Sequence, residues 1–281
     1  MPPISQVVLI TGATRGIGRV TALHMAKRGH RVIATGRNQE LLATLAEEAK
    51  RGSLPVTTAQ MDVNDDVAVQ RVVQETLGDF GRIDALVNNA GYGLWGPIEE
   101  LELDELRAVF ETNLFAVVRV SQAVIPQMRE RKSGAIVNIG SMAGQVTLPV
   151  NGAYSATKFA LEAISRAMHM ELAHTGIRVT LIEPGVFQTD FHKNVVIGRR
   201  VMQPGSPNRE RTLRMRTRPP AENRLRADPK RVAMRIRQAV EAKGVKARYA
   251  TGLDAHAGKY AARWAPDWLI DYVLMKALKL R

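Results

Sequence analysis

The chain has 281 residues, of which 45% are hydrophobic, and its formal net charge is +13. This length and composition predict one folded domain spanning 1–281, and they exclude a disordered or fibrous protein. The absence of cysteine excludes disulfides, thiolate metal sites and a cysteine nucleophile. The first residues carry no signal pattern and the apolar stretches are shorter than a membrane span, so we expect a soluble, cytoplasmic protein.

Short apolar runs alternate along the chain with longer segments of helical periodicity. The runs lie at 7–11, 31–36, 57–63, 85–90, 135–141, 178–184 and 247–252. Strands rich in Val and Ile that are separated by helices pair in parallel, with helices on both faces of the sheet. The sequence therefore predicts an α/β fold, a doubly wound Rossmann sheet of about seven parallel strands. Ligands bind such sheets at the carboxyl ends of the strands.

The first apolar run leads into "TGATRGIG" at 11–18, which opens a helical segment. Gly12 allows a sharp exit from the strand, while Gly16 and Gly18 allow close approach of phosphates and of the strand. The amides and the dipole of a helix N-terminus favour an anion. We predict a dinucleotide cradle rather than a glycine-rich turn without a ligand, formed by Gly12, Thr14, Arg15, Gly16, Ile17 and Gly18.

The second run ends in Thr35-Gly36-Arg37, where an enzyme that binds NAD would place an acidic residue. The Arg37 guanidinium suits a 2′-phosphate, and Arg15 adds a second cation nearby, so the pair favours NADP(H). The alternative is that both arginines are solvated surface charges. At the end of the third run, Asp62 precedes Val63 and either binds the adenine amino group or caps the next helix.

The stretch "YSATK" places Tyr154 and Lys158 four residues apart, on one face of a helix. An adjacent ammonium group lowers the pKa of a phenol, which makes Tyr154 a candidate general acid and base. Ser141, at the end of the fifth run, is placed to bind the same substrate oxygen, and Asn113 in "ETNLF" to join a proton relay. Taken alone, the Tyr-Lys pair is also compatible with an amphipathic helix surface.

The combination of TGxxxGxG, NNAG, a serine at a strand end and YxxxK resembles the short-chain dehydrogenase/reductase family, from about Val7 to Thr189. The resemblance implies a nicotinamide cofactor and oxidoreduction of an alcohol and carbonyl pair. It makes Tyr154 the acid and base and Lys158 its modulator and a ribose ligand, with Ser141 binding the substrate oxygen and Asn113 holding the relay water. The further cofactor positions that it implies are Asn89, Ala90, Gly91, Pro184, Gly185, Val186 and Thr189.

We therefore expect an NADP(H)-dependent dehydrogenase or reductase that acts on carbonyls and secondary alcohols. The stretch "NNAGYGLWGPIEEL" also resembles members that act on steroids, retinoids or other lipophilic carbonyls. The family resemblance implies a homodimer or homotetramer, and we expect no nucleic-acid partner. The alternative is an NADPH-sensing regulatory module that binds a polyanion through its basic segment.

That basic segment lies between Lys193 and Arg237 and holds 14 Lys and Arg residues against three acids. Residues 190–227 show neither strand nor helix periodicity, and we predict a substrate lid there, with a solvated charged face as the alternative. The stretch 264–281 predicts an amphipathic helix that packs on its own domain or on a partner subunit, or lies on a membrane. Its residues at four-residue steps are Trp264, Trp268, Tyr272, Lys276 and Leu280.

Overall fold

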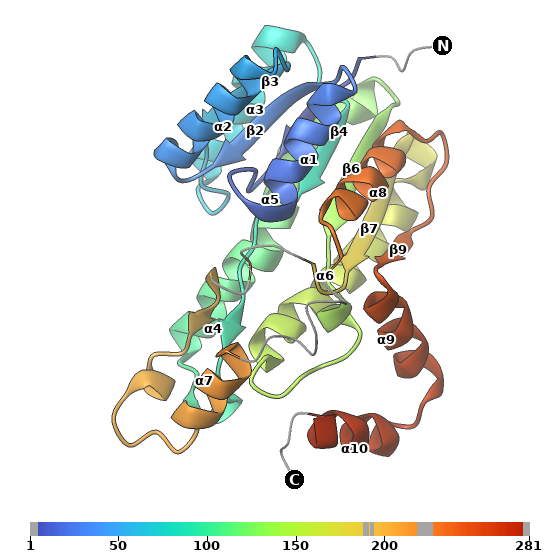
Figure 1. Ribbon diagram of the computed structural model, residues 1–281. Helices are drawn as coiled ribbons and strands as arrows, with labels where there is room; N and C mark the ends of the chain where they lie inside the picture. Colours follow the sequence, from blue (N-terminus) through green and yellow to red (C-terminus); the bar gives the residue numbers. More distant parts are fainter. Residues whose placement is uncertain (1–4, 188–190, 192–193, 218–226, 278–281) are drawn as a thin grey trace.

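The computed structural model describes residues 5–187, 191, 194–217 and 227–277 (Figure 1). Its main sheet has seven parallel strands in the order β3-β2-β1-β4-β6-β7-β9, which confirms the predicted fold. The strands are β1 (Val7–Ile10), β2 (Arg31–Gly36), β3 (Val56–Gln60), β4 (Ala85–Asn88), β6 (Gly134–Ile139), β7 (Ile177–Pro184) and β9 (Arg248–Thr251). Several predicted runs extend past their strands because residues such as Thr11 and Ser141 already belong to the loops at the carboxyl ends.

Helices cover both faces of this sheet because successive strand residues point to opposite sides. Val8 and Ile10 pack in the core cluster that includes α1 and α8, whereas Val7 and Leu9 pack in the cluster that includes α3 and α5. The helices are α1 (Gly16–Lys27), α2 (Gln39–Arg51), α3 (Asp66–Phe80), α4 (Leu103–Phe110), α5 (Ala116–Glu130), α6 (Gly152–Glu171) and α8 (Lys230–Glu241). Short turns of helix are η1 (Ile98–Glu100), η3 (Met142–Gly144), η4 (Ala173–Thr175) and η6 (Arg200–Met202).

The helical stretch Leu103–Glu130 joins α4 to α5 through a π-helical segment, η2 (Glu111–Phe115). By length and composition it could cross a membrane, contrary to the expectation that every apolar stretch is too short. Its apolar residues, among them Val120 and Val124, pack under β4 and β6. The stretch is therefore accounted for as a core helix of the domain.

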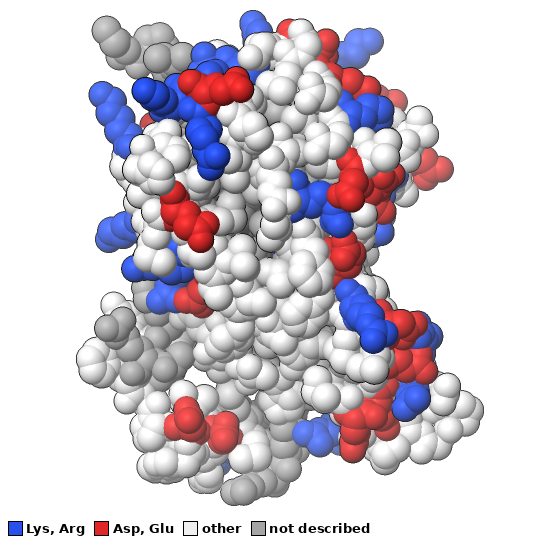
Figure 2. Space-filling model, turned by 180° about the vertical axis from the view of Figure 1, so that it is seen from behind, with Lys and Arg blue, Asp and Glu red and all other residues white. Residues whose placement is uncertain are grey.

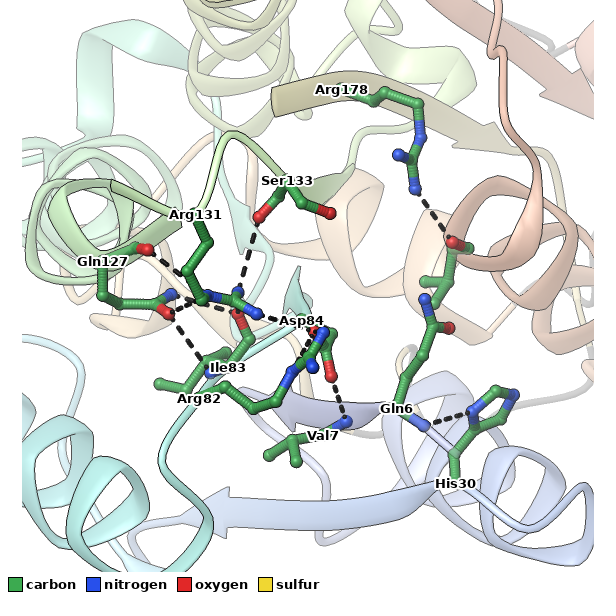
Figure 3. A network of polar contacts seen from close by, with 11 residues as sticks. Gln6, Val7, His30, Arg82, Ile83, Asp84, Gln127, Arg131, Ser133 and Arg178 are labelled. Carbon is green, nitrogen blue, oxygen red and sulfur yellow. Dashed lines mark hydrogen bonds and ion pairs between the residues drawn. The ribbon is translucent and has the colours of Figure 1, made fainter. Parts of the chain in front are cut away.

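At the amino ends of the strands, a polar network holds the sheet together (Figure 3). The Asp84 carboxylate accepts a hydrogen bond of 2.9 Å from the Val7 amide and further bonds from the guanidinium groups of Arg82 and Arg131. Arg131 also donates to the carbonyl oxygen of Ile83 at 2.8 Å. This network connects β1, the start of β4 and the end of α5 at the edge opposite to the predicted site.

The region predicted as an irregular lid contains regular structure in its described part. Strand β8 (Val196–Ile197) pairs in parallel with β5 (Leu94–Trp95), and α7 (Arg209–Thr217) follows. The prediction missed β8 because a two-residue strand has no measurable period, and it missed α7 because that helix carries almost no apolar face. Residues 190, 192–193 and 218–226 of the predicted lid lie outside the described residues.

Acidic side chains pair with several arginines of the basic segment. Arg199 forms ion pairs with Glu102 and Asp104, Arg200 pairs with Glu102, and Arg214 pairs with Glu210. On the rear face of the molecule, basic and acidic side chains lie side by side above and below a largely uncharged middle region (Figure 2). On that face, charges of both signs are therefore mixed rather than gathered into one basic patch.

Within the stretch 264–281, predicted as one helix, the structure has α10 (Asp267–Ala277), and a separate helix, α9 (Leu253–Trp264), precedes it. The prediction was wrong about the start because Pro266 separates the two helices, and Leu280 lies outside the described residues. Trp264 and Trp268 are 75% and 69% exposed, so this side does not pack on the domain. Figure 1 shows α10 below the sheet, apart from the helices that cover it.

Candidate active site

The glycine turn after β1 is shaped by close contacts with its neighbours. Gly12 has a φ of +64°, and a Cβ at this position would lie 2.8 Å from the Ala90 Cα. A Cβ on Gly18 would collide with the Gly12 carbonyl oxygen. The Asn89 side-chain amide donates to the carbonyl oxygens of Thr11 and Gly12, both at 2.9 Å, so it fixes the turn from the end of β4.

The ends of β2 and β3 form the next part of the cleft. Arg37 is largely exposed, and its Nη1 lies 3.9 Å from Asp62 Oδ2. The other Asp62 oxygen accepts from the Asn64 amide at 2.9 Å, while the cap of α3 is Asp65. The alternative that Asp62 caps this helix is therefore wrong, and Asp62 borders the cleft beside Arg37.

These residues fit a dinucleotide with a 2′-phosphate. Gly12 and Gly16 both have positive φ, which lets the backbone turn sharply before α1, and Arg15 stands at the N-cap of that helix. Helix N-terminal amides attract phosphate, and the guanidinium groups of Arg15 and Arg37 are forked donors for a further phosphate. Arg15 also donates to Asn194 Oδ1 at 3.2 Å, which links the cradle to the segment before β8.

One cleft of about 2150 Å³ runs along the carboxyl edge of the sheet. Most predicted site residues line it. Exceptions are Gly18 and Asn113, which lie behind its wall, and Thr189, which is outside the described residues. The predicted residues that line it are Gly12, Thr14, Arg15, Gly16, Ile17, Arg37, Asp62, Val63, Asn89, Ala90, Gly91, Ser141, Tyr154, Lys158, Pro184, Gly185 and Val186. Within the described residues, no group of His, Asp and Glu side chains is arranged to hold a metal ion.

Ser141, Tyr154 and Lys158 meet where β6 ends and α6 begins. Ser141 caps η3, and its side chain hydrogen-bonds the buried Tyr154 hydroxyl. The Lys158 ammonium donates to the Ile139 carbonyl oxygen at 3.0 Å and lies 5.6 Å from the centre of the Tyr154 ring. The helical spacing thus brings the predicted catalytic groups together, with one main-chain carbonyl holding the lysine in place.

Burial controls the protonation of these two side chains. Desolvation raises the pKa of Tyr154 to about 12, although the hydrogen bond with Ser141 acts in the opposite direction. Desolvation also lowers the pKa of Lys158 to about 8. The net pKa shift of Tyr154 is therefore upward, not downward as predicted, because burial disfavours the charged form of the phenol.

Asn113 is buried beside the site and hydrogen-bonds residues next to it. Its Oδ1 accepts from the Tyr92 amide at 3.0 Å, and its Nδ2 donates to the Tyr92 carbonyl oxygen at 2.9 Å and to Thr157 Oγ1 at 3.1 Å. The side chain therefore ties the loop after β4 to α6. These contacts join the loop after β4 to the helix that carries Tyr154 and Lys158, and the relay role of Asn113 stays a prediction.

The sequence indicated the apolar end of the cleft only through the stretch that holds Leu94 and Trp95. The Phe191 ring lies 5.5 Å from the Tyr154 ring, centre to centre, and it comes from the loop after β7. Side chains from β5, η3 and its following loop, α7 and α10 complete this end, which includes Leu94, Trp95, Val146, Leu148, Val150, Met215, Ile270 and Leu274. In α10 the local signal was two apolar pairs at four-residue spacing, Leu269 with Val273 and Ile270 with Leu274, beside the more obvious aromatic residues.

Comparisons with known proteins agree with this arrangement. The 3-ketodihydrosphingosine reductase of Bacteroides thetaiotaomicron is 37% identical over 189 residues, which cover 67% of this chain and 66% of that protein. Sulfoacetaldehyde reductase 2 of Chromohalobacter salexigens is 41% identical over 190 residues, 67% of this chain and 75% of that protein.

Solved structures show the same likeness over more of the chain. The actinorhodin polyketide ketoreductase with NADPH is 30% identical, has a TM-score of 0.77, and aligns with 91% of this chain and 98% of its own. The model of the short chain dehydrogenase family matches residues 6–199, which include the glycine turn, Ser141, Tyr154 and Lys158. The chain therefore belongs to the short-chain dehydrogenase family.

Proposed function

We propose that this protein is an NADP(H)-dependent oxidoreductase that interconverts a lipophilic carbonyl compound and the corresponding secondary alcohol. The observation that carries the proposal is the place of Ser141, Tyr154 and Lys158. They lie together at the point where the glycine-lined groove meets the apolar end of one cleft. NADPH, when bound, supplies the hydride for reduction.

The protein side chains supply the proton. A phenol whose pKa is about 12 is protonated at neutral pH, so Tyr154 can donate its proton to the carbonyl oxygen of the substrate. Ser141 is placed to donate a hydrogen bond to the same oxygen. The Lys158 ammonium stabilises the phenolate that is left on Tyr154, since an opposite charge nearby favours the ionised form.

The apolar end of the cleft supports a lipophilic substrate. Trp95, Phe191 and Ile270 line it together with other apolar side chains. Arg199, a charged residue that lines the cleft, is paired with Asp104. Two of the similar proteins are named for a ketosphingoid and for a polyketide, whereas a third is named for the small anion sulfoacetaldehyde. We favour the lipophilic class because the wall of the cleft is apolar.

A preference for NADP(H) rests on Arg37 and Arg15 and on the NADPH in the similar ketoreductase structure. A polyanion site receives less support. Of the basic segment, Arg199 and Arg200 are already paired with acidic residues of the same chain. The regulatory alternative would also leave the close grouping of Ser141, Tyr154 and Lys158 without a purpose.

The test is an optical assay of NADPH and NADH oxidation with a panel of carbonyl compounds. The panel should contain long-chain and polycyclic ketones and, for comparison, short aldehydes that carry a sulfonate or carboxylate. We expect turnover of apolar ketones with NADPH and a lower kcat/KM with NADH and with the anionic aldehydes. Faster turnover of the anionic aldehydes would contradict the substrate class, and absence of NADPH binding would contradict the function.

A further inference from the structure

The turn that follows β7 is held by two residues from the end of β9 and the start of α9. The Gly185 amide donates to the Thr251 carbonyl oxygen at 2.9 Å. The next amide, that of Val186, donates to the Asp254 carboxylate at 2.5 Å. Consecutive amides of this turn therefore depend on one short segment that lies more than sixty residues further along the chain.

The space around Asp254 is shaped by glycines on both strand ends. A Cβ on Gly185 would overlap the Asp254 carboxylate, and so would a Cβ on Gly252. Gly252 has a φ of +108°, which other residues rarely adopt. Asp254 itself borders the cleft, next to Pro184, Gly185 and Val186. The carboxylate is thus enclosed by backbone on one side and faces the ligand space on the other.

If the proposed function holds, the order of the strands shows which end of the cofactor lies beside the turn at Gly185 and Val186. Arg37 and Asp62, at the ends of β2 and β3, mark the adenine end of the cleft. Tyr154 marks the reacting end beside β6, and β7 lies on the far side of β6 from the adenine end. The Gly185–Val186 turn therefore borders the nicotinamide end.

We propose that Asp254 is a positioning residue for the nicotinamide end of the cofactor. Its carboxylate holds the Val186 amide, so that the turn after β7 keeps the shape against which the cofactor packs. Because Asp254 lies in the first turn of α9, and α10 lines the apolar end of the cleft, the same contact couples this helical segment to cofactor binding.

The test measures NADPH binding directly, by titration calorimetry or by cofactor fluorescence, with Asp254→Ala, Asp254→Asn and the control Asp271→Ala. Asp271 is an exposed acid of α10 that does not line the cleft. Loss of a hydrogen bond to a charged group weakens binding by about ten-fold or more, which we expect for Asp254→Ala. The Asn variant keeps an acceptor for the Val186 amide and should bind within about three-fold of wild type, as should Asp271→Ala.

A second readout is hydrogen exchange across α9 and α10. NADPH should slow exchange there in the wild type and in Asp254→Asn, but not in Asp254→Ala. If the Ala variant does not fold, Asp254→Leu, which matches Asn in shape but cannot accept a hydrogen bond, takes its place.

The outcomes separate this inference from the function on which it rests. Wild-type protein that binds neither NADPH nor NADH would overturn both. NADPH binding by Asp254→Ala at wild-type affinity would overturn the inference alone. Equal weakening in the Ala and Asn variants would also overturn it, since that result assigns the effect to charge rather than to the hydrogen bond.

Discussion

Tyr154 is the residue on which the proposed chemistry depends most directly. Tyr154→Phe removes the only atom that transfers the proton and leaves the ring in place, so kcat should fall by a factor of about 10² or more. NADPH affinity should stay close to that of the wild type. Tyr249→Phe is the matched control, because the Tyr249 hydroxyl accepts a hydrogen bond from the Lys246 amide and does not line the cleft. Wild-type turnover by Tyr154→Phe would refute the mechanism.

Arg37 carries the prediction on cofactor choice. Its guanidinium is largely exposed at the adenine end, 3.9 Å from Asp62 Oδ2, which leaves it room to turn toward a 2′-phosphate. Arg37→Ala should weaken NADPH binding by roughly 10- to 100-fold, the cost of a charge-assisted hydrogen bond, and should hardly change NADH binding. Arg51→Ala, at the exposed end of α2, serves as the control. Equal affinity of the wild type for the two cofactors would contradict this assignment.

The lowered pKa of Lys158 makes the free energy of unfolding depend on pH. Its pKa is lowered to about 8 by burial, so between pH 8 and 10.5 the unfolded chain binds a proton that the folded chain does not. The stability of the wild type should therefore rise with pH across this window. Lys158→Met should abolish that rise and be more stable than wild type at pH 7 by about 3 kcal/mol. Denaturant unfolding of both proteins at pH 7, 8 and 9.5 measures the effect, and parallel pH profiles would contradict it.

Some of the site residues could be predicted from the sequence, and others could not. Gly12, Asn89 and Ser141 were predictable because each follows a strand directly, and the carboxyl ends of parallel strands share one edge. Asp254 and Phe191 were not predictable, since their roles arise from contacts with residues far away in the chain. The direction of the Tyr154 pKa shift was also missed, because burial depends on packing that helical spacing does not describe.

The helix α10 presents two different sides. Trp268 and Tyr272 are exposed, while Ile270 and Leu274 line the cleft. Ile270→Asp would place a charge in the apolar end of the cleft, which should raise KM for an apolar ketone by about ten-fold or more without changing NADPH affinity. Tyr272→Ser, on the outer side, should leave both constants unchanged. Steady-state kinetics with direct cofactor titration check this, and an unchanged KM for Ile270→Asp would show that substrate does not reach α10.

Helices and strands whose apolar residues repeat at a regular spacing were predicted from the sequence, and those without such a repeat were not. The buried strands of the sheet appear as apolar runs of Val and Ile, and α6 follows from the spacing of Tyr154 and Lys158. The two residues of β8 and the polar helix α7 carry no such pattern. Pro266 did signal the break between α9 and α10, because proline lacks the amide that a helix interior needs. The four-residue aromatic steps obscured that signal.

At the scale of the whole molecule, the cleft lies at the carboxyl edge of the sheet, and the polar network around Asp84 lies at the opposite edge. Burial raises the pKa of Asp84, but the Val7 amide and the guanidinium groups of Arg82 and Arg131 outweigh it and hold the pKa below its usual value. The stabilisation is complete above pH 3.8, the usual Asp value, and is lost as the pH falls toward the lower folded value.

Asp84→Asn should therefore lower the free energy of unfolding by about 2–3 kcal/mol at pH 7, while kcat and NADPH affinity stay unchanged. The gap between variant and wild type should close as the pH falls below 3.8. Denaturant unfolding between pH 3 and 7 gives the measurement. A gap that does not depend on pH would mean that the carboxylate charge contributes nothing to this network.

The atoms that surround a glycine decide whether a second substitution elsewhere can compensate for its replacement by a larger residue. A Cβ on Gly134 would meet the flexible side chain of Met128, so a smaller residue at 128 could restore the fit. A Cβ on Gly12 would instead meet the main-chain atoms of Ala90, which every residue type has in common. Selection for suppressors of Gly134→Ala should therefore recover second-site changes at Met128, whereas suppressors of Gly12→Ala should be confined to reversion. The turn after β1 is in this sense closed to gradual divergence, while the start of β6 at Gly134 is open to it.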